Sequence, residues 1–428
     1  DPVTIQKEFY CPKCSKHIAT AACQRVVSSS LDPLTGETIN RRHWEPVYLY
    51  GRSARGTWSR PITSSDLALI ERVRAIEAEG AIPSGLIDWG DLHRSGYHTG
   101  ITRFHHLYTA RNFQVLSTLW QGIQRFRGKI ADALRLFVLS YNSSHSTLMT
   151  RVVAKKNQKD FVITGAQSGV MYVSGLPVEK NILEGLRRKL KTFIQAFELT
   201  HGSRSEIAVV NGSSTRLHLD DNSVDYVFTD PPFGDFIPYA EVNQVNEAWL
   251  GKLTDRTEEA IISPSQSKGV EEYGRLMKAV FSETARVLRP TGSATVVFHA
   301  SKPAVWNALG EAIRASGFGV ELTSILDKTQ VSFKQVVHQG GTRGDAIFLL
   351  IPEPMTTRDS SDGTMSLDRV ISQLEIAAEG DEAELAPRRL YSRYVAYCIE
   401  ASVKVVASAP EFYSHLSLRR GALPDECL

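Results

Sequence analysis

A short apolar segment, Tyr226–Thr229, leads directly into Asp230-Pro231-Pro232-Phe233. An apolar run of this length, bounded by turn residues, is typical of a β-strand. Two consecutive prolines fix the backbone and remove two amide donors, so the strand is expected to end at Asp230. Because ligands of open α/β sheets bind beyond the carboxyl ends of the strands, we expect this segment to lie at a functional sheet edge.

The surrounding region, residues 205–352, has the alternating pattern of an α/β fold. Amphipathic helices are predicted over Tyr273–Leu288 and Val305–Ile313, each followed by glycine. Strands are predicted at Ile207–Val210, Tyr226–Thr229, Ala294–Phe298, Val320–Ile325 and Ala346–Ile351. Alternating strands and helices favour a mostly parallel sheet with helices on both faces.

The rest of the 428-residue chain divides into three further segments, and this length allows two or three domains. Residues 1–60 are irregular and contain cysteine, residues 61–204 are mainly helical, and residues 353–428 form an acidic linker followed by a helix around Tyr391–Val406. In the helical segment, apolar spacing predicts helices at Ser64–Glu79, Phe113–Ile123, 129–150 and Ile182–Phe197, with a loop over 80–103.

The Asp-Pro-Pro-Phe segment has the groups needed to hold an exocyclic amine of a nucleobase. Such an amine is a poor nucleophile because its lone pair is delocalised into the ring. Hydrogen bonds from its two N–H groups to the Asp230 carboxylate and the Pro231 carbonyl favour a pyramidal nitrogen that attacks a methyl group in line. Alignment of this kind supplies up to roughly 7–11 kcal/mol.

Phe233 completes this hypothesis as a surface for the base. A base in a duplex must be flipped out to reach such a pocket, and stacking on an aromatic ring contributes roughly 1–3 kcal/mol per base. The alternative interpretation is a strand that ends in a Pro-Pro turn, with Phe233 in the core.

Several segments around this motif carry a family resemblance. They are Gly212-Ser213-Ser214-Thr215, Asn222-Ser223-Val224-Asp225, Thr229–Phe233, Tyr239-Ala240-Glu241 and Leu288–Gly292, with a weaker match over Phe104–Trp120. Together they resemble the amino-group DNA methyltransferases, and most of all the zinc-ribbon-containing adenine-specific DNA methylases of prokaryotes.

The resemblance implies a Rossmann-like methyltransferase sheet, with residues 205–352 as its catalytic region and residues 61–204 as a recognition insert. It also implies S-adenosylmethionine as donor, adenine in DNA as target, and a role in restriction-modification or phage defence. The implied catalytic residues are Asp230, Pro231, Pro232 and Phe233, and the implied cofactor contacts are Gly212, Ser213 and Asp230. Asp-Pro-Pro-Phe-Gly also resembles RNA guanine-amine methyltransferases, which leaves that alternative open.

One element of the family is missing. Its Phe-x-Gly-x-Gly cofactor loop, which precedes the cysteine-rich stretch in family members, has no convincing match here, and this chain begins at that stretch. A loop of this type brings backbone N–H groups close to the cofactor. We therefore expect the loop to come from a preceding segment or a second chain. The alternative is a non-catalytic or split-enzyme subunit that binds DNA.

The cysteines predict a zinc-ribbon-like element near the start of the chain. Cys11 and Cys14 have the spacing of a metal knuckle, and Cys23 follows without a second Cys-x-x-Cys. Structural zinc requires four ligands, and His17 or His43 is the candidate fourth. The alternative is three ordinary thiols.

Charge and hydropathy bear on partners and location. The net charge is +2, so contacts to DNA are expected from local basic runs, with Lys155, Lys156, Arg187 and Arg188 as candidates for phosphate contact. The alternative for these runs is a solvated surface. We find neither a membrane-spanning apolar stretch nor a signal peptide, and five cysteines do not make a disulfide framework, so we expect a cytoplasmic protein.

Overall fold

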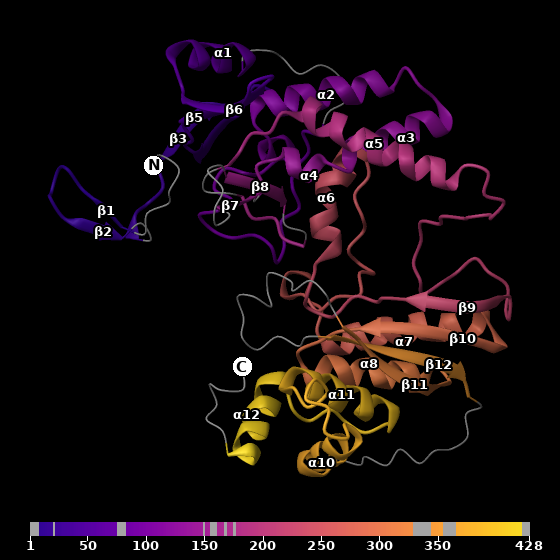
Figure 1. The fold of residues 1–428 in the computed structure, drawn as a ribbon. Helices are drawn as coiled ribbons and strands as arrows, with labels where there is room; N and C mark the ends of the chain where they lie inside the picture. Colours follow the sequence, from indigo (N-terminus) through magenta and orange to yellow (C-terminus); the bar gives the residue numbers. More distant parts are fainter. Residues whose placement is uncertain are drawn as a thin grey trace. The chain divides into compact units, whose positions relative to one another are not determined.

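The computed structural model describes residues 8–19, 22–74, 83–148, 150–154, 161–166, 169–173, 177–327, 344–353 and 365–421. The chain forms two compact units (Figure 1). Unit 1 comprises Asp1–Glu206 and Tyr239–Thr254, and unit 2 comprises Ile207–Pro238 and Asp255–Leu428. Among the described helices, none combines the length and apolar character that crossing a membrane requires.

Unit 1 begins with three antiparallel hairpins where the sequence predicted irregular structure. They pair β1 (Glu8–Tyr10) with β2 (His17–Ala19), β3 (Val27–Leu31) with β4 (Thr38–Arg42), and β5 (Tyr48–Ser53) with β6 (Gly56–Pro61). These strands are mostly exposed and polar, so they lack the apolar alternation that predicts a strand.

The helices of unit 1 agree largely with the expected apolar spacing. They are α1 (Ser64–Arg74), α2 (Ala110–Ile123), α3 (Gly128–Leu139), α4 (Asn142–His145), α5 (Ile182–Thr200) and α6 (Tyr239–Leu250). The helix predicted over 129–150 is instead two helices, α3 and α4. The 3-10 helix η2 (Phe104–Leu107) and the hairpin of β7 (Thr150–Ala154) and β8 (Phe161–Ala166) complete the unit.

Helix α6, which follows the Asp-Pro-Pro-Phe segment in sequence, is a core element of unit 1. Its Glu241 side chain is buried and accepts hydrogen bonds from the backbone N–H of Gly90 at 2.7 Å and of Leu92 at 3.1 and 3.2 Å. Gln244 exchanges two 2.9 Å hydrogen bonds with the backbone of Asp88. These contacts fix the loop over 88–92 on α6.

Unit 2 contains a four-stranded sheet in the order β11-β12-β10-β9. The strands are β9 (Val224–Thr229), β10 (Leu288–Phe298), β11 (Phe318–Asp327) and β12 (Gly344–Pro352). The β9–β10 pair is parallel, whereas β12 is antiparallel to both β10 and β11. The sheet is therefore mixed, and the prediction of a mostly parallel sheet is wrong.

The strand predicted at Ile207–Val210 is also wrong. This segment has no strand structure, and Ile207, Val209 and Val210 are 84%, 93% and 72% exposed. A strand exists through pairing with a neighbour, and no described strand pairs with this segment.

Among the described residues, the helices that pack on the sheet of unit 2 lie on one face, where two had been expected. The register places Val227, Val296 and Phe348 on that face, and all three belong to one apolar cluster or pack against it. Helices α7 (Val270–Val287), α8 (Pro303–Ala315) and α11 (Pro387–Glu400) contribute the other side of this cluster, with α10 (Leu367–Ala377) and α12 (Ala409–Arg420) packed beyond (Figure 1). The expected single C-terminal helix is thus three, and they belong to the core.

Because the Glu241 carboxylate is buried and hydrogen-bonded, we predict that replacing it with an amide lowers the free energy of unfolding. In Glu241→Gln one acceptor oxygen becomes an amide donor, so a buried N–H of Gly90 or Leu92 loses its partner. The free energy of unfolding should fall by about 1–3 kcal/mol. Urea denaturation followed by tryptophan fluorescence measures this change. Glu198→Gln on the exposed end of α5 is the control, and equal midpoints for the two variants would contradict the assigned role of Glu241.

Candidate functional site

Three strand ends bring polar side chains to one edge of the sheet in unit 2. Strands β9 and β10 are parallel, with Thr229 paired to Val296, so their carboxyl ends emerge together and are followed by exposed Asp230 and by His299. Strand β12 is antiparallel to β10, so it begins at this edge and contributes Asp345. This is the edge at which the sequence predicted a site.

The loop after Asp230 is held in place by contacts from two helices and a turn. The Tyr273 hydroxyl on α7 donates a 2.6 Å hydrogen bond to the carbonyl of Pro232. Gly234 has a φ of +73°, and a Cβ there would lie 3.2 Å from side-chain atoms of Ile262 and Val305. Lys302 forms an ion pair with Asp235. The backbone around Pro231 and Pro232 is therefore preorganised.

The aromatic ring of Phe233 is half-buried and lies in a cluster of rings. It meets Phe298 edge to face, with ring centroids 5.3 Å apart and planes at 83°. The rings of His299 and Phe236 lie 6.1 and 6.3 Å from it. Part of Phe233 thus belongs to the core, as the alternative interpretation expects, while its position beside Asp230 suits a ring that stacks on a base.

The sequence analysis missed His299 and Asp345. The His299 Nδ1 atom lies 3.2 Å from a carboxylate oxygen of Asp345, and both side chains are largely buried. His299 directly follows the predicted strand Ala294–Phe298, so the rule that placed Asp230 at a strand end would have found it. Asp345 required knowledge that β12 is antiparallel, which the sequence pattern does not contain.

The residues proposed to contact the cofactor do not form an enclosed site. Gly212 and Ser213 are exposed, and a Cβ at Gly212 would meet no atom within 4 Å. The Ser213 hydroxyl lies 2.7 Å from that of Thr215, within its own turn. The turn is open at Gly212, so the residues present do not enclose a bound S-adenosylmethionine.

The cysteine motif occupies the turn between β1 and β2. Backbone N–H groups of Cys14 and Lys13 point at the Cys11 sulfur and hold the pKa of its thiol below the ordinary value. Such a thiolate is a good metal ligand. Among the described residues, neither Cys23 nor another candidate ligand lies close enough to Cys11 and Cys14 to form a set of three metal ligands. The zinc site stays a prediction.

A different buried cluster joins the β3–β4 hairpin to η2. The Asp32 carboxylate accepts hydrogen bonds from Nε2 of His105 and of His106, each at 2.8 Å, and from the Leu34 backbone N–H at 2.9 Å. Despite its burial, these hydrogen bonds, first that of His106, hold the pKa of Asp32 well below its usual range. The Arg41 guanidinium caps the backbone carbonyl of His106 at 2.7 Å.

The hydrogen bonds of this cluster indicate a structural role rather than a metal site. Nδ1 of His106 accepts from the backbone N–H groups of Thr102 and Arg103 at 3.2 and 3.3 Å. That tautomer places its proton on Nε2, the atom that faces Asp32, so this nitrogen has no lone pair for a metal. The three side chains instead join two segments that are distant in sequence.

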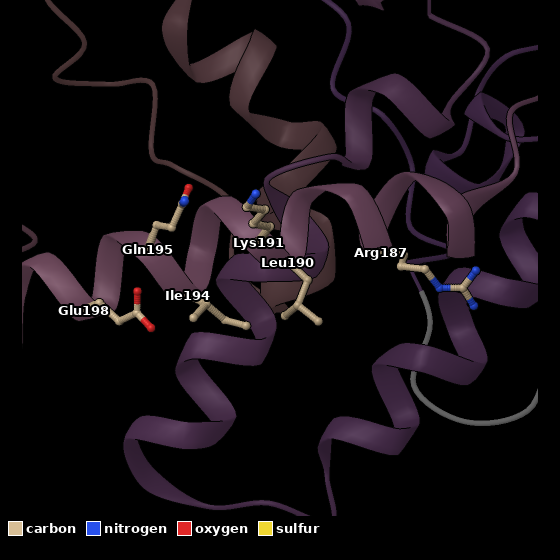
Figure 2. A pocket seen from close by; sticks show the side chains of 6 residues that line it. All are labelled: Arg187, Leu190, Lys191, Ile194, Gln195 and Glu198. Carbon is tan, nitrogen blue, oxygen red and sulfur yellow. The ribbon is translucent and has the colours of Figure 1, made fainter.

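The basic residues proposed to contact DNA are only partly described. Lys155 and Lys156 lie outside the described residues. Arg187 and Arg188 are exposed on α5, where Arg187 pairs with Glu184. A surface pocket of about 410 Å³ runs along this helix and is lined by Arg187, Leu190, Lys191, Ile194, Gln195 and Glu198 (Figure 2). Its lining is both apolar and charged, so it is not a purely phosphate-binding surface.

Because two histidines are buried, we predict that the free energy of unfolding falls in mild acid. Burial lowers the pKa of His106 and of His145 to about 4, from an ordinary value of 6.5. Between these values the unfolded chain binds more protons than the folded chain, so the free energy of unfolding falls as the pH falls. By pH 5 the loss should be about 2 kcal/mol per histidine.

Urea denaturation at pH 7 and pH 5 measures this loss. The imidazole nitrogens of His145 have no hydrogen-bond partner among the described residues, so His145→Leu should remove its share of the pH dependence. His201→Gln changes an exposed histidine and should leave the dependence as it is. An unchanged pH dependence in His145→Leu would contradict the assignment.

Comparison with known proteins adds no family assignment to this geometry. No protein-family model matches the chain, and no curated protein sequence matches it.

Proposed function

We propose that this chain supplies the acceptor part of an adenine-specific DNA methyltransferase. The observation that carries the proposal is the preorganised loop at the carboxyl end of β9, where exposed Asp230 precedes a Pro-Pro-Phe segment held by Tyr273 and by packing around Gly234. A rigid loop of this kind fixes an amine for in-line attack, because the acceptors do not have to reorganise during the reaction.

Each residue of the loop has a distinct role in this proposal. The Asp230 carboxylate and the Pro231 carbonyl accept the two N–H groups of adenine N6, and among the described residues no donor occupies that carbonyl. The Pro232 carbonyl accepts from Tyr273 and so acts as an anchor. Phe233 stacks on the flipped base, and its ring is held by an edge-to-face contact with Phe298.

The methyl donor that the family resemblance implies is S-adenosylmethionine, which supplies a methyl group bound to a positively charged sulfur. The open surroundings of Gly212 favour a donor site outside the described residues of this chain. The proposal is therefore an enzyme whose acceptor part lies here and whose donor part is contributed by another segment or chain.

Asp230→Ala tests the acceptor role. In the complete assembly this variant should transfer methyl groups to DNA at least about 100-fold more slowly, since a positioned acceptor of this kind contributes on the order of 10²–10³ in rate. DNA binding should remain. Transfer of tritiated methyl groups to DNA measures the rate. Asp220→Ala, a nearby exposed carboxylate, is the control, and equal rates for the two variants would show the mechanism to be wrong.

Titration calorimetry tests where the donor binds. The isolated chain should bind S-adenosylmethionine weakly or undetectably, since the described residues leave open space around Gly212. Micromolar affinity for the isolated chain would show that it contains a complete donor site.

A further inference from the structure

The open end of the β3–β4 hairpin brings two arginines together in unit 1. The strands are antiparallel, with Val27 paired to Arg42, and the His43 N–H donates a 2.9 Å hydrogen bond to the carbonyl of Val26. The residues just before β3 and just after β4 therefore lie side by side. They form a surface pocket of about 400 Å³, lined by Arg25, Val26, Arg42, His43, Trp44 and Glu45. Small-ligand clefts have volumes of roughly 300–1,000 Å³.

Each of the two guanidinium groups lies over an aromatic ring. The guanidinium carbon of Arg42 lies 5.6 Å from the centre of the Trp44 ring, and its Nη1 donates a 3.0 Å hydrogen bond to the carbonyl of Tyr97. The guanidinium carbon of Arg25 lies 5.3 Å from the centre of the Tyr97 ring. Tyr97 thus contacts both arginines. Because stacking restrains the side chains beforehand, less conformational entropy is lost when a ligand binds.

The two positive charges are close enough to act on each other. Burial first, and then the positive charge of Arg25, lower the pKa of Arg42 below its ordinary value. Arg25 is exposed, and no ion pair joins it to a carboxylate of the described residues. Among the described residues that line the pocket, Glu45 carries the one carboxylate, and the Nε2 atom of His43 lies 3.0 Å from it. The lining therefore has an excess of positive charge, which an anion would neutralise.

We propose that Arg25 and Arg42 form a binding site for a phosphate group in this pocket. Arginine suits phosphate because its planar guanidinium donates two parallel hydrogen bonds to two phosphate oxygens. Exposed Arg25 contacts the phosphate directly, while buried Arg42, which also lines the pocket, supplies a restrained positive charge. The site lies in unit 1 and the Asp230 loop lies in unit 2. The inference therefore goes beyond the proposed function and does not depend on it.

The pocket along α5 suits a phosphate less well (Figure 2). There Arg187 pairs with Glu184, and the lining includes Leu190 and Ile194. In the pocket at the β3–β4 hairpin, by contrast, two arginines face one carboxylate that His43 already contacts. A phosphodiester of a nucleic-acid backbone and the phosphate monoester of a free nucleotide offer the same oxygens to these arginines, so the experiment includes both.

Fluorescence anisotropy of the full chain with a fluorescein-labelled DNA duplex tests the site. Arg25→Gln should weaken binding about tenfold and reduce the slope of log affinity against log salt concentration by about one, since one phosphate contact is lost. Arg25→Lys keeps the charge without the planar fork, so it should keep the slope and lose only part of the affinity. Arg55→Gln, at an exposed arginine in the turn between β5 and β6, is the matched control and should change neither quantity.

Calorimetric titration with 5′-adenosine monophosphate and with inorganic phosphate identifies the source of the phosphate. Duplex binding that Arg25→Gln weakens and Arg55→Gln does not supports a backbone site. Binding of 5′-adenosine monophosphate that only Arg25→Gln abolishes, with duplex binding unchanged, supports a site for a free nucleotide. If the two variants behave alike toward the duplex, the nucleotide and inorganic phosphate, the proposal is overturned. Equal urea midpoints for the two variants check that both fold, and methyl transfer is measured separately through Asp230→Ala.

Discussion

The parallel pairing of β9 with β10 is the constraint on which the candidate site depends. Because parallel strands end at one edge, the pairing of Thr229 with Val296 brings the Asp230 loop and His299 out of the sheet together. A slip by one residue would turn every side chain of β9 to the opposite face. Phe228 would then enter the core and Val227 would leave it, so the same register that positions Asp230 also determines which aromatic residues are exposed.

The chain that leaves this loop is restrained at both ends. On the side of unit 2, Tyr273 binds the Pro232 carbonyl and the packing around Gly234 fixes the turn. On the side of unit 1, Glu241 and Gln244 join α6 to the loop over 88–92 through buried hydrogen bonds. A buried carboxylate that accepts several backbone N–H groups is costly to disturb. The Asp230 loop is thus anchored within unit 2, and α6 is anchored within unit 1.

Sequence patterns predicted those parts of the fold that depend on local order. The stripes of α2, α5 and α7 and the strands β9 and β10 were visible because their apolar residues form stripes or short runs of the length of one element. The antiparallel direction of β12 and the absence of a strand at Ile207–Val210 could not be predicted from such patterns. Both depend on which strand lies beside the segment. The hairpins β1–β6 were missed because their side chains are mostly exposed.

The residues of the candidate site also differ in whether a local sequence pattern could reveal them. Asp230 and Phe233 were found because motif and strand end are adjacent in sequence, whereas His299 and Asp345 meet only through strand pairing. The cluster of Asp32 with His105 and His106 joins segments more than 70 residues apart, and no local sequence pattern predicts such a contact.

The face of the sheet opposite the described helices has an energetic consequence. Mixed and antiparallel sheets commonly pack one face on a core and leave the other in contact with water, so apolar side chains on that second face leave apolar area in water. In unit 2 the covered face includes α7, α8 and α11, while Phe228 and Leu322 on the opposite face are more than half exposed. At roughly 25 cal/mol per Å², covering these side chains would stabilise an assembly appreciably without any specific polar contact. The polar groups at the strand ends would then be left for specificity, which is consistent with a site whose chemistry is concentrated at one edge of the sheet.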